Sequence, residues 1–155
     1  MTREERMVRD ELAALALDER GRHLLQLALR GIQESGRGLT TGCWVKRDGG
    51  VSGCLFQHAY WQGLQEGVFE PAELPKGEIR GYVGDDDFAF VMRAIRAFDA
   101  LGKRRFRSVR RVGPLGLPVR ALDEERWRAE VERILIDVLA RSPGPSAVRP
   151  PGVPA

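Results

Sequence analysis

The sequence contains little cysteine, since Cys43 and Cys54 are the only two in 155 residues. Two cysteines cannot form the multi-bridge framework of small secreted domains, and a chain of this length can bury a sufficient core without one. Histidine is equally scarce, with His23 and His58 as the only examples. The sequence therefore predicts one globular domain whose cysteines are thiols in a reducing compartment.

Long uncharged hydrophobic runs are also missing. No segment approaches the roughly 20 residues that span a bilayer, and the N-terminus MTREERMVRDE is charged where a secretory signal would become apolar. Apolar residues at 43% and charged residues at 30% are typical of globular proteins and exclude wholesale disorder. We expect a cytoplasmic protein with no membrane partner.

Several signatures of known sites are absent as well. The glycines between residues 36 and 53 never form GxGxxG, the cysteines form no CxxC knuckle, and no P-loop or RNA-recognition signature occurs. The chain has no internal repeat, and no motif in it indicates a particular family. Lysine is rare beside arginine, an imbalance typical of a GC-rich coding sequence, so arginine abundance alone does not indicate function.

Hydrophobic periodicity predicts a mainly α fold, a compact single-domain bundle of four to five helices with at most two or three short strands. An α+β fold is the alternative. The predicted helices lie at about 4–34, 53–66, 85–101 and 123–141. Asp18 interrupts the first and can cap a second helix, so a helical hairpin is expected there. Ser52 is predicted to cap the helix at 53, and Gly102 to end the helix that starts at 85.

The connections between these helices carry weaker signals. Residues 43–45, followed by the Asp-Gly-Gly of 48–50, predict a short strand and a tight turn. Residues 78–83 follow two prolines and alternate in polarity, which predicts a brief strand or an extended connection. Residues 142–155 contain five prolines and few side chains worth burying, so a disordered Pro-rich tail is predicted after a domain at 1–141.

Positive charge is concentrated in one segment. Residues 103–122 contain seven basic residues and no acidic one, while the other 18 basic residues face 22 acidic ones, so the rest of the chain sums to −4. Cations neutralise phosphates, and an aromatic ring can stack on an unpaired base. The alternatives are a solvated edge strand or internal pairing with acids such as Asp85–Asp87, Glu124 and Glu125. The candidate nucleic-acid-binding residues are Lys103, Arg104, Arg105, Phe106, Arg107, Arg110 and Arg111.

A second candidate site consists of Cys43, Cys54, His58 and His23. On a helix, Cys54 and His58 would share a face at the spacing of paired metal ligands, and zinc accepts thiolate and imidazole together. Cys54 near a helix start could instead be a redox or nucleophilic thiol, although no histidine follows His58 to act as a separate base. Burial of cysteine as a small hydrophobe is the more common explanation.

These observations favour a small non-enzymatic regulatory or binding protein that contacts an anionic partner through residues 103–111, with DNA and RNA as candidates. The first alternative is a zinc-binding or thiol-dependent protein, including an enzyme, built on Cys43, Cys54 and His58. Without zinc, the sequence implies no cofactor. The second alternative is a helical protein–protein interaction module, including a homodimer formed through the N-terminal helices.

Overall fold

Two helices begin the chain, as the sequence predicts. The computed structural model describes residues 1–41, 44 and 52–142. Helix α1 (Arg3–Leu15) and helix α2 (Glu19–Glu34) meet at a short corner, and Asp18 caps α2 by accepting a hydrogen bond from the Arg20 N–H at 3.1 Å. A Cβ at Gly21 would lie 2.1 Å from the Leu15 carbonyl oxygen, so only glycine fits this corner.

A small parallel pairing precedes the third helix. Strand β1 (Gly38–Leu39) pairs with β2 (Ser52–Gly53), and helix α3 (Leu55–Gln65) follows with Cys54 as its N-cap residue. The prediction of Ser52 as the cap is therefore wrong, because the backbone of Ser52–Gly53 pairs with β1 and delays the helix start. Gly67, at φ 75°, follows the end of α3 as expected for a left-handed C-terminal glycine. Of the strand and turn predicted at 43–50, all but Trp44 lie outside the described residues.

Residues 75–83 are a helix rather than the extended segment that the alternation predicted. Helix α4 (Pro75–Val83) starts at a proline, whose missing N–H would have had no partner in the first turn. Ile79 and Val83, four residues apart, are both buried, as one helical face requires. The prediction of an extended segment is wrong because the polar and apolar residues of this short segment fit both a strand, with a period of two, and a helix.

Helix α5 (Asp85–Arg105) extends beyond its predicted end at Gly102. A Cβ at Gly102 would lie 2.3 Å from Cγ2 of Thr41, so this glycine permits close packing inside the helix and does not terminate it. Lys103–Arg105 therefore form the last turn of α5, and the predicted basic connection starts only after them.

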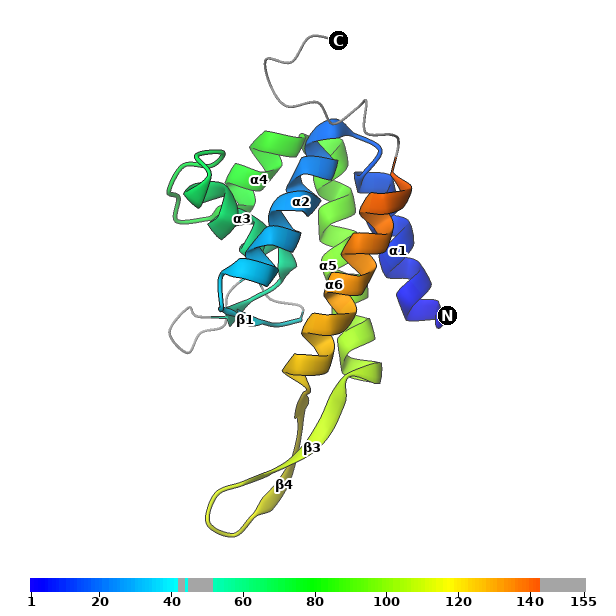
Figure 1. The fold of residues 1–155 in the computed structure, drawn as a ribbon, viewed down its shortest axis with the longest axis vertical. Helices are drawn as coiled ribbons and strands as arrows, with labels where there is room; N and C mark the ends of the chain where they lie inside the picture. Colours follow the sequence, from blue (N-terminus) through cyan, green and yellow to red (C-terminus); the bar gives the residue numbers. More distant parts are fainter. Residues whose placement is uncertain (42–43, 45–51, 143–155) are drawn as a thin grey trace.

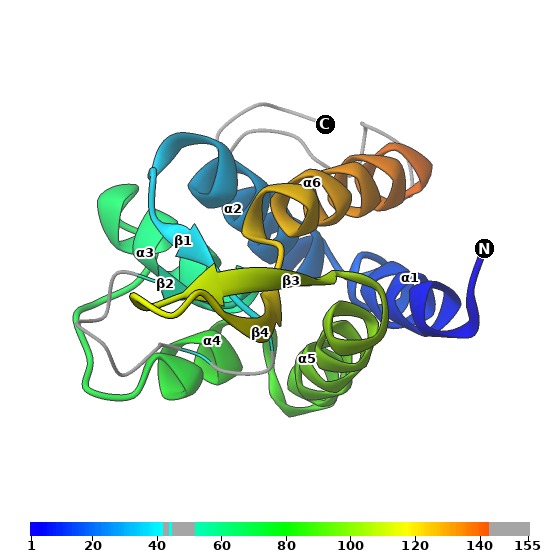
Figure 2. The same cartoon turned by 90° about the horizontal axis from the view of Figure 1, so that it is seen from below.

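A β-hairpin separates the last two long helices. Strands β3 (Arg107–Val112) and β4 (Leu117–Leu122) are antiparallel, and helix α6 (Glu124–Arg141) follows immediately. Asp123, where the last helix is predicted to start, caps α6 by accepting from the Arg126 N–H at 3.3 Å. The hairpin projects away from the helices (Figure 1), and Figure 2 views the molecule from the end that carries it.

One buried cluster contains side chains from all six described helices. Helix α1 packs mainly on α5 and α2 mainly on α3, so the predicted helical hairpin opens around the core instead of packing on itself. The apolar stripe of α6 is buried in this cluster, at Trp127, Val131, Ile134, Leu135 and Val138.

The mainly α prediction is confirmed. Among the described residues there is one helix and one strand more than the predicted maximum, because α4 occupies a segment predicted as extended and because β1, β2 and β4 were not foreseen. No helix in the described part of the chain is long and apolar enough to cross a membrane. The predicted tail lies outside the described residues, apart from Ser142.

Candidate nucleic-acid interface

The hairpin of residues 107–122, hereafter the arm, has two chemically different faces. Residues paired across an antiparallel ladder share a face. The first face carries Arg107, Val109, Arg111, Pro118, Arg120 and Leu122. The second carries Ser108, Arg110, Val112, Leu117, Val119 and Ala121. Three of the four arginines of the arm therefore lie on the first face, and exposed aliphatic side chains predominate on the second.

The arm is fixed to the helical body at its root. The ring of Phe106 lies 5.3 Å from that of Trp127, which is only 1% exposed. The Asp123 N–H donates to the Phe106 carbonyl at 2.6 Å and so holds the two strand ends together. The Arg126 guanidinium lies 5.3 Å from the centre of the same phenyl ring. Phe106, predicted to stack on a base, is therefore a packing residue that orients the arm.

Two of the predicted binding cations are engaged within the protein. Lys103 pairs with Asp99 at 3.0 Å, and Arg104 pairs with Glu4 at 3.0 Å. Both lie in the last turn of α5, where positive charge also interacts favourably with the exposed carbonyl ends of the helix. Helix stabilisation explains these two residues without a ligand.

The cations of the arm are in a different situation. Arg107, Arg110 and Arg120 are exposed and make no ion pair or side-chain hydrogen bond with any residue that the structure describes. The same holds for Arg105 at the end of α5, within the same described ranges. Arg111 donates to the Gly116 carbonyl at 3.0 Å, which leaves its charge without a neutralising acid.

None of the acids predicted as internal partners pairs with the arm within the described residues, and at least two of them are engaged elsewhere. Asp85 pairs with Arg80 at 2.7 Å. The Glu124 carboxylate accepts a hydrogen bond from the Leu39 N–H at 2.8 Å and so ties α6 to β1. Over residues 1–41, 44 and 52–142, no carboxylate pairs with an arginine of the arm. Internal pairing therefore accounts for Lys103 and Arg104 but not for the arm.

The turn at the end of the arm has a fixed shape. Gly113 and Gly116 adopt φ of 73° and 61°, and the Gly116 N–H donates to the Gly113 carbonyl at 3.1 Å. Pro114 restricts the backbone between them. Leu115 occupies the tip with 83% of its surface exposed.

Sequence reasoning missed two residues of this site, Arg120 and Leu115. The antiparallel register places Arg120 opposite Val109, among the cations of β3. The signal was present, since Gly-Pro-Leu-Gly separates two segments of strand-forming composition and is typical of a hairpin loop. The prediction used the density of arginine in residues 103–111 and did not use this turn signal, so it stopped short of the second strand.

The second candidate site is only partly described, because Cys43 lies outside the described residues. His58 is fully buried, and its Nε2–H donates to the Gly38 carbonyl at 2.8 Å. Its Nδ1 lies 3.4 Å from the Ser35 hydroxyl oxygen. Burial lowers the pKa of His58, which keeps the ring neutral. These contacts give the imidazole a structural role between α2, α3 and β1.

His23 lies apart from His58. Its Nδ1 is 2.5 Å from the hydroxyl oxygen of Tyr82 on α4. His58 instead abuts Gly31, eight residues farther along α2, which corresponds to about 12 Å along the helix axis. Among the described residues, no three His, Cys, Asp or Glu side chains are grouped so that they could hold a metal ion.

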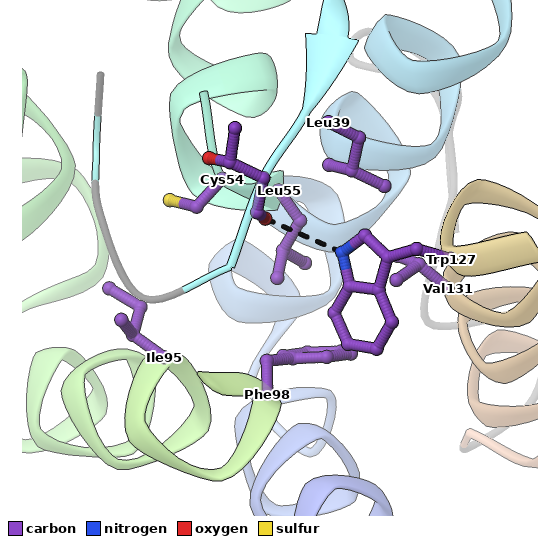
Figure 3. Close-up of a pocket in the computed structure, with 8 residues that line it drawn as sticks. Leu39, Cys54, Leu55, Ile95, Phe98, Trp127 and Val131 are labelled. Atoms are coloured by element: carbon purple, nitrogen blue, oxygen red, sulfur yellow. Dashed lines mark hydrogen bonds between the residues drawn. The ribbon is translucent and has the colours of Figure 1, made fainter. Parts of the chain in front are cut away.

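Cys54 is buried beside a very small cavity. The cavity has a volume of about 10 Å³, and Leu39, Phe98 and Trp127 contribute to its walls. Figure 3 shows the Cys54 sulfur pointing away from Trp127, whose indole N–H donates to the Thr40 carbonyl at 3.4 Å. A space of this size holds at most one water, so it offers no room for a substrate beside the thiol.

The N-terminal helices use their apolar stripes internally. Val8, Leu12 and Leu15 of α1 are fully buried in the core of the same chain. On this helix Met7 is exposed, at 48% of its surface. The apolar stripe of α1 is therefore covered by the core of its own chain and is not available as a dimer interface.

The described residues thus define a mainly α protein with a cationic two-stranded arm. No family model, no curated protein and no solved structure matches the chain.

Proposed function

We propose that this protein is a non-enzymatic binding protein that holds duplex nucleic acid through its arm. The observation that carries the proposal is the set of exposed arginines, Arg107, Arg110 and Arg120, on an arm without a single acidic residue. Within the described residues these guanidinium groups have no neutralising partner, so an external polyanion would supply one.

The shape of the arm supports a polymeric anion rather than a single small one. Each strand has six residues, which at about 3.4 Å per residue makes the arm roughly 20 Å long. Its arginines are distributed along this length and on both faces, so they do not converge on one point. A nucleic-acid backbone presents phosphates at comparable intervals, and neutralising them releases condensed counterions.

A duplex fits better than a single strand. Proteins that bind single strands commonly stack bases on exposed aromatic rings. The described arm contains no aromatic residue, and Phe106 at its root packs against Trp127. Backbone contacts by arginine without stacking are typical of duplex binding.

A regulatory role without catalysis agrees with this mode of binding, as does a location in the cytoplasm, where nucleic acid is accessible. The helical body would orient the arm through the Phe106–Trp127 contact and would need no cofactor.

The proposal is tested by fluorescence anisotropy of a labelled duplex titrated with the protein at low salt. The combined variant Arg107→Gln, Arg110→Gln and Arg120→Gln removes three phosphate contacts. We expect affinity to fall on the order of a hundredfold. The matched control changes Arg6, Arg96 and Arg141 to Gln, which lowers net charge equally while leaving the arm intact.

Three results would contradict the proposal. The first is no binding by the wild-type protein, and the second is an equal loss in the two triple variants, since net charge alone would then explain the affinity. The third is binding to phosphatidylserine vesicles in preference to the duplex, which would assign the arm to an anionic lipid surface.

A further inference from the structure

The tip of the arm combines exposure with rigidity. Leu115 is more exposed than any other large apolar side chain among the described residues, at 83% against 73% for Leu74. The two positive-φ glycines, Pro114 and the hydrogen bond from Arg111 to Gly116 hold the turn around it. A turn that only connects two strands commonly consists of small polar residues, so an exposed leucine at this position is unusual.

Apolar and cationic side chains are ordered along the arm. Val112 and Leu117 form the last cross-strand pair before the turn and are 42% and 57% exposed. Arg111 and Arg110 follow one and two residues behind that pair, hence about 3 and 7 Å farther from the tip. The end of the arm is therefore apolar, and the charge begins behind it.

We infer, resting on the proposed function, that the arm enters the major groove of B-form DNA and that Leu115 contacts the 5-methyl groups of thymine there. The major groove, about 12 Å wide, admits a two-stranded ribbon, whereas the minor groove is about 6 Å wide. The major groove is about 8.5 Å deep. An apolar tip on the base edges would thus leave Arg110 and Arg111 near the level of the backbone. An arm that lies obliquely in the groove would also keep Arg107 and Arg120 along its phosphate rim.

The chemistry of the groove identifies the group that Leu115 meets. Base edges in the major groove present hydrogen-bond donors and acceptors, and the thymine methyl is the apolar exception. An exposed leucine gains nothing by burial against polar edges, but it gains by covering a methyl group. Duplex RNA lacks this methyl and has a major groove too deep and narrow for side chains to read.

The test compares two short A·T-rich duplexes of one sequence, one containing thymine and the other deoxyuridine throughout. Affinities are measured by fluorescence anisotropy at one fixed salt concentration. We expect the wild-type protein to bind the thymine duplex about fourfold more tightly for one methyl group covered. Leu115→Ala should bind the thymine duplex as weakly as the wild type binds the deoxyuridine duplex and should not distinguish the two.

Two control variants separate the contact of Leu115 with thymine from general effects on binding. Leu74→Ala, at another highly exposed leucine outside the arm, should keep the full preference for thymine. Arg120→Gln should weaken binding to both duplexes by the same factor, because phosphate contacts carry no base information.

Equal binding of the two duplexes by the wild type would overturn the thymine contact while leaving duplex binding intact. An unchanged preference in Leu115→Ala would likewise overturn the role of Leu115. Failure of the wild type to bind either duplex would overturn the proposed function and this inference together. Leu115 lies on an exposed turn whose glycines and proline are retained, so Leu115→Ala should keep the fold.

Discussion

Many arginines of the helical body have partners inside the protein, whereas the arginines of the arm do not pair with any described acid. In the body, Arg9 pairs with Glu5 and Asp137, both at 3.2 Å, and Arg128 donates to the carbonyls of Ile32 and Arg37. On the arm, none of the arginines pairs with an acid among the described residues. In a chain so rich in arginine, composition alone therefore does not indicate function. A missing partner alone does not indicate it either, since Arg6 and Arg96 on the helices also pair with no described residue; the arm differs because its unpaired arginines are concentrated on a projection without an acidic residue.

The largest expected effect tests whether arginine in the body is structural. Arg128→Gln removes two charge-assisted hydrogen bonds to carbonyls at the junction of α2, β1 and α6. We expect it to lower the free energy of unfolding by about 2 kcal/mol. Arg110→Gln on the arm should change that free energy by less than about 0.5 kcal/mol, because Arg110 has no partner among the described residues.

Urea unfolding followed by circular dichroism measures both free energies. Equal destabilisation by the two substitutions would contradict the difference between body and arm, since Arg110 would then contribute to folding as much as Arg128 does.

The body also contains an acid whose environment disfavours its charge. Burial, followed by the neighbouring Asp18, raises the pKa of Asp87 to about 6 from 3.8, and the hydrogen bond with Asp87 lowers the pKa of Asp18. Because the folded state holds this proton more tightly than the unfolded one, stability is lost as pH rises from about 4 to 6 and stays lower above that range.

Asp87→Asn should remove the loss of stability that occurs between about pH 4 and 6. At neutral pH we expect a gain of about 1 kcal/mol, discounted for partial exposure, that disappears as pH falls towards 4. Asp86→Asn is the comparison, since it removes an exposed charge from the same first turn of α5 and with it only the smallest of the causes that raise the pKa of Asp87, so its gain should be smaller. Thermal unfolding of both variants between pH 4 and 7 measures the difference. A gain independent of pH, or an equal gain in Asp86→Asn, would contradict the account.

The long helices were predictable because burial follows their period. Leu12 and Leu15 on α1, and Trp127 and Val131 on α6, repeat at helical spacing and are all buried. The caps at Asp18 and Asp123 were predictable for a local reason, since a short acidic side chain can accept from a nearby backbone N–H. These features depend on neighbours within one or two turns.

Features that depend on distant contacts were not predictable. Gly102 resembled a helix end, although its role is to admit Thr41, sixty-one residues earlier in the chain. Phe106 resembled a base-stacking residue until its contact with Trp127 placed it at the root of the arm. The partners of Lys103 and Arg104, and the absence of partners for Arg107 and Arg110 within the described residues, likewise follow only from tertiary structure.

The sequence therefore predicts a candidate interface without resolving which of its residues are free to bind. The charge concentration predicts this interface at residues 103–111, and that assignment stays a prediction. The hairpin register adds Arg120 to the candidate binding residues. Lys103 and Arg104 form ion pairs within the protein, and Phe106 packs on Trp127, so these three are no longer candidates. The predicted site of Cys43, Cys54, His58 and His23 stays a prediction as a whole, although the three described members are not brought together.

The salt dependence of duplex binding by the wild-type protein tests the central claim most directly. If the four arginines of the arm each neutralise a phosphate, the logarithm of the association constant should fall linearly with the logarithm of salt concentration, with a slope of about −3 to −4. The triple variant of Arg107, Arg110 and Arg120 should retain a slope of about −1. A wild-type slope near zero, or the same slope in both proteins, would contradict the assignment of the arm as the nucleic-acid interface.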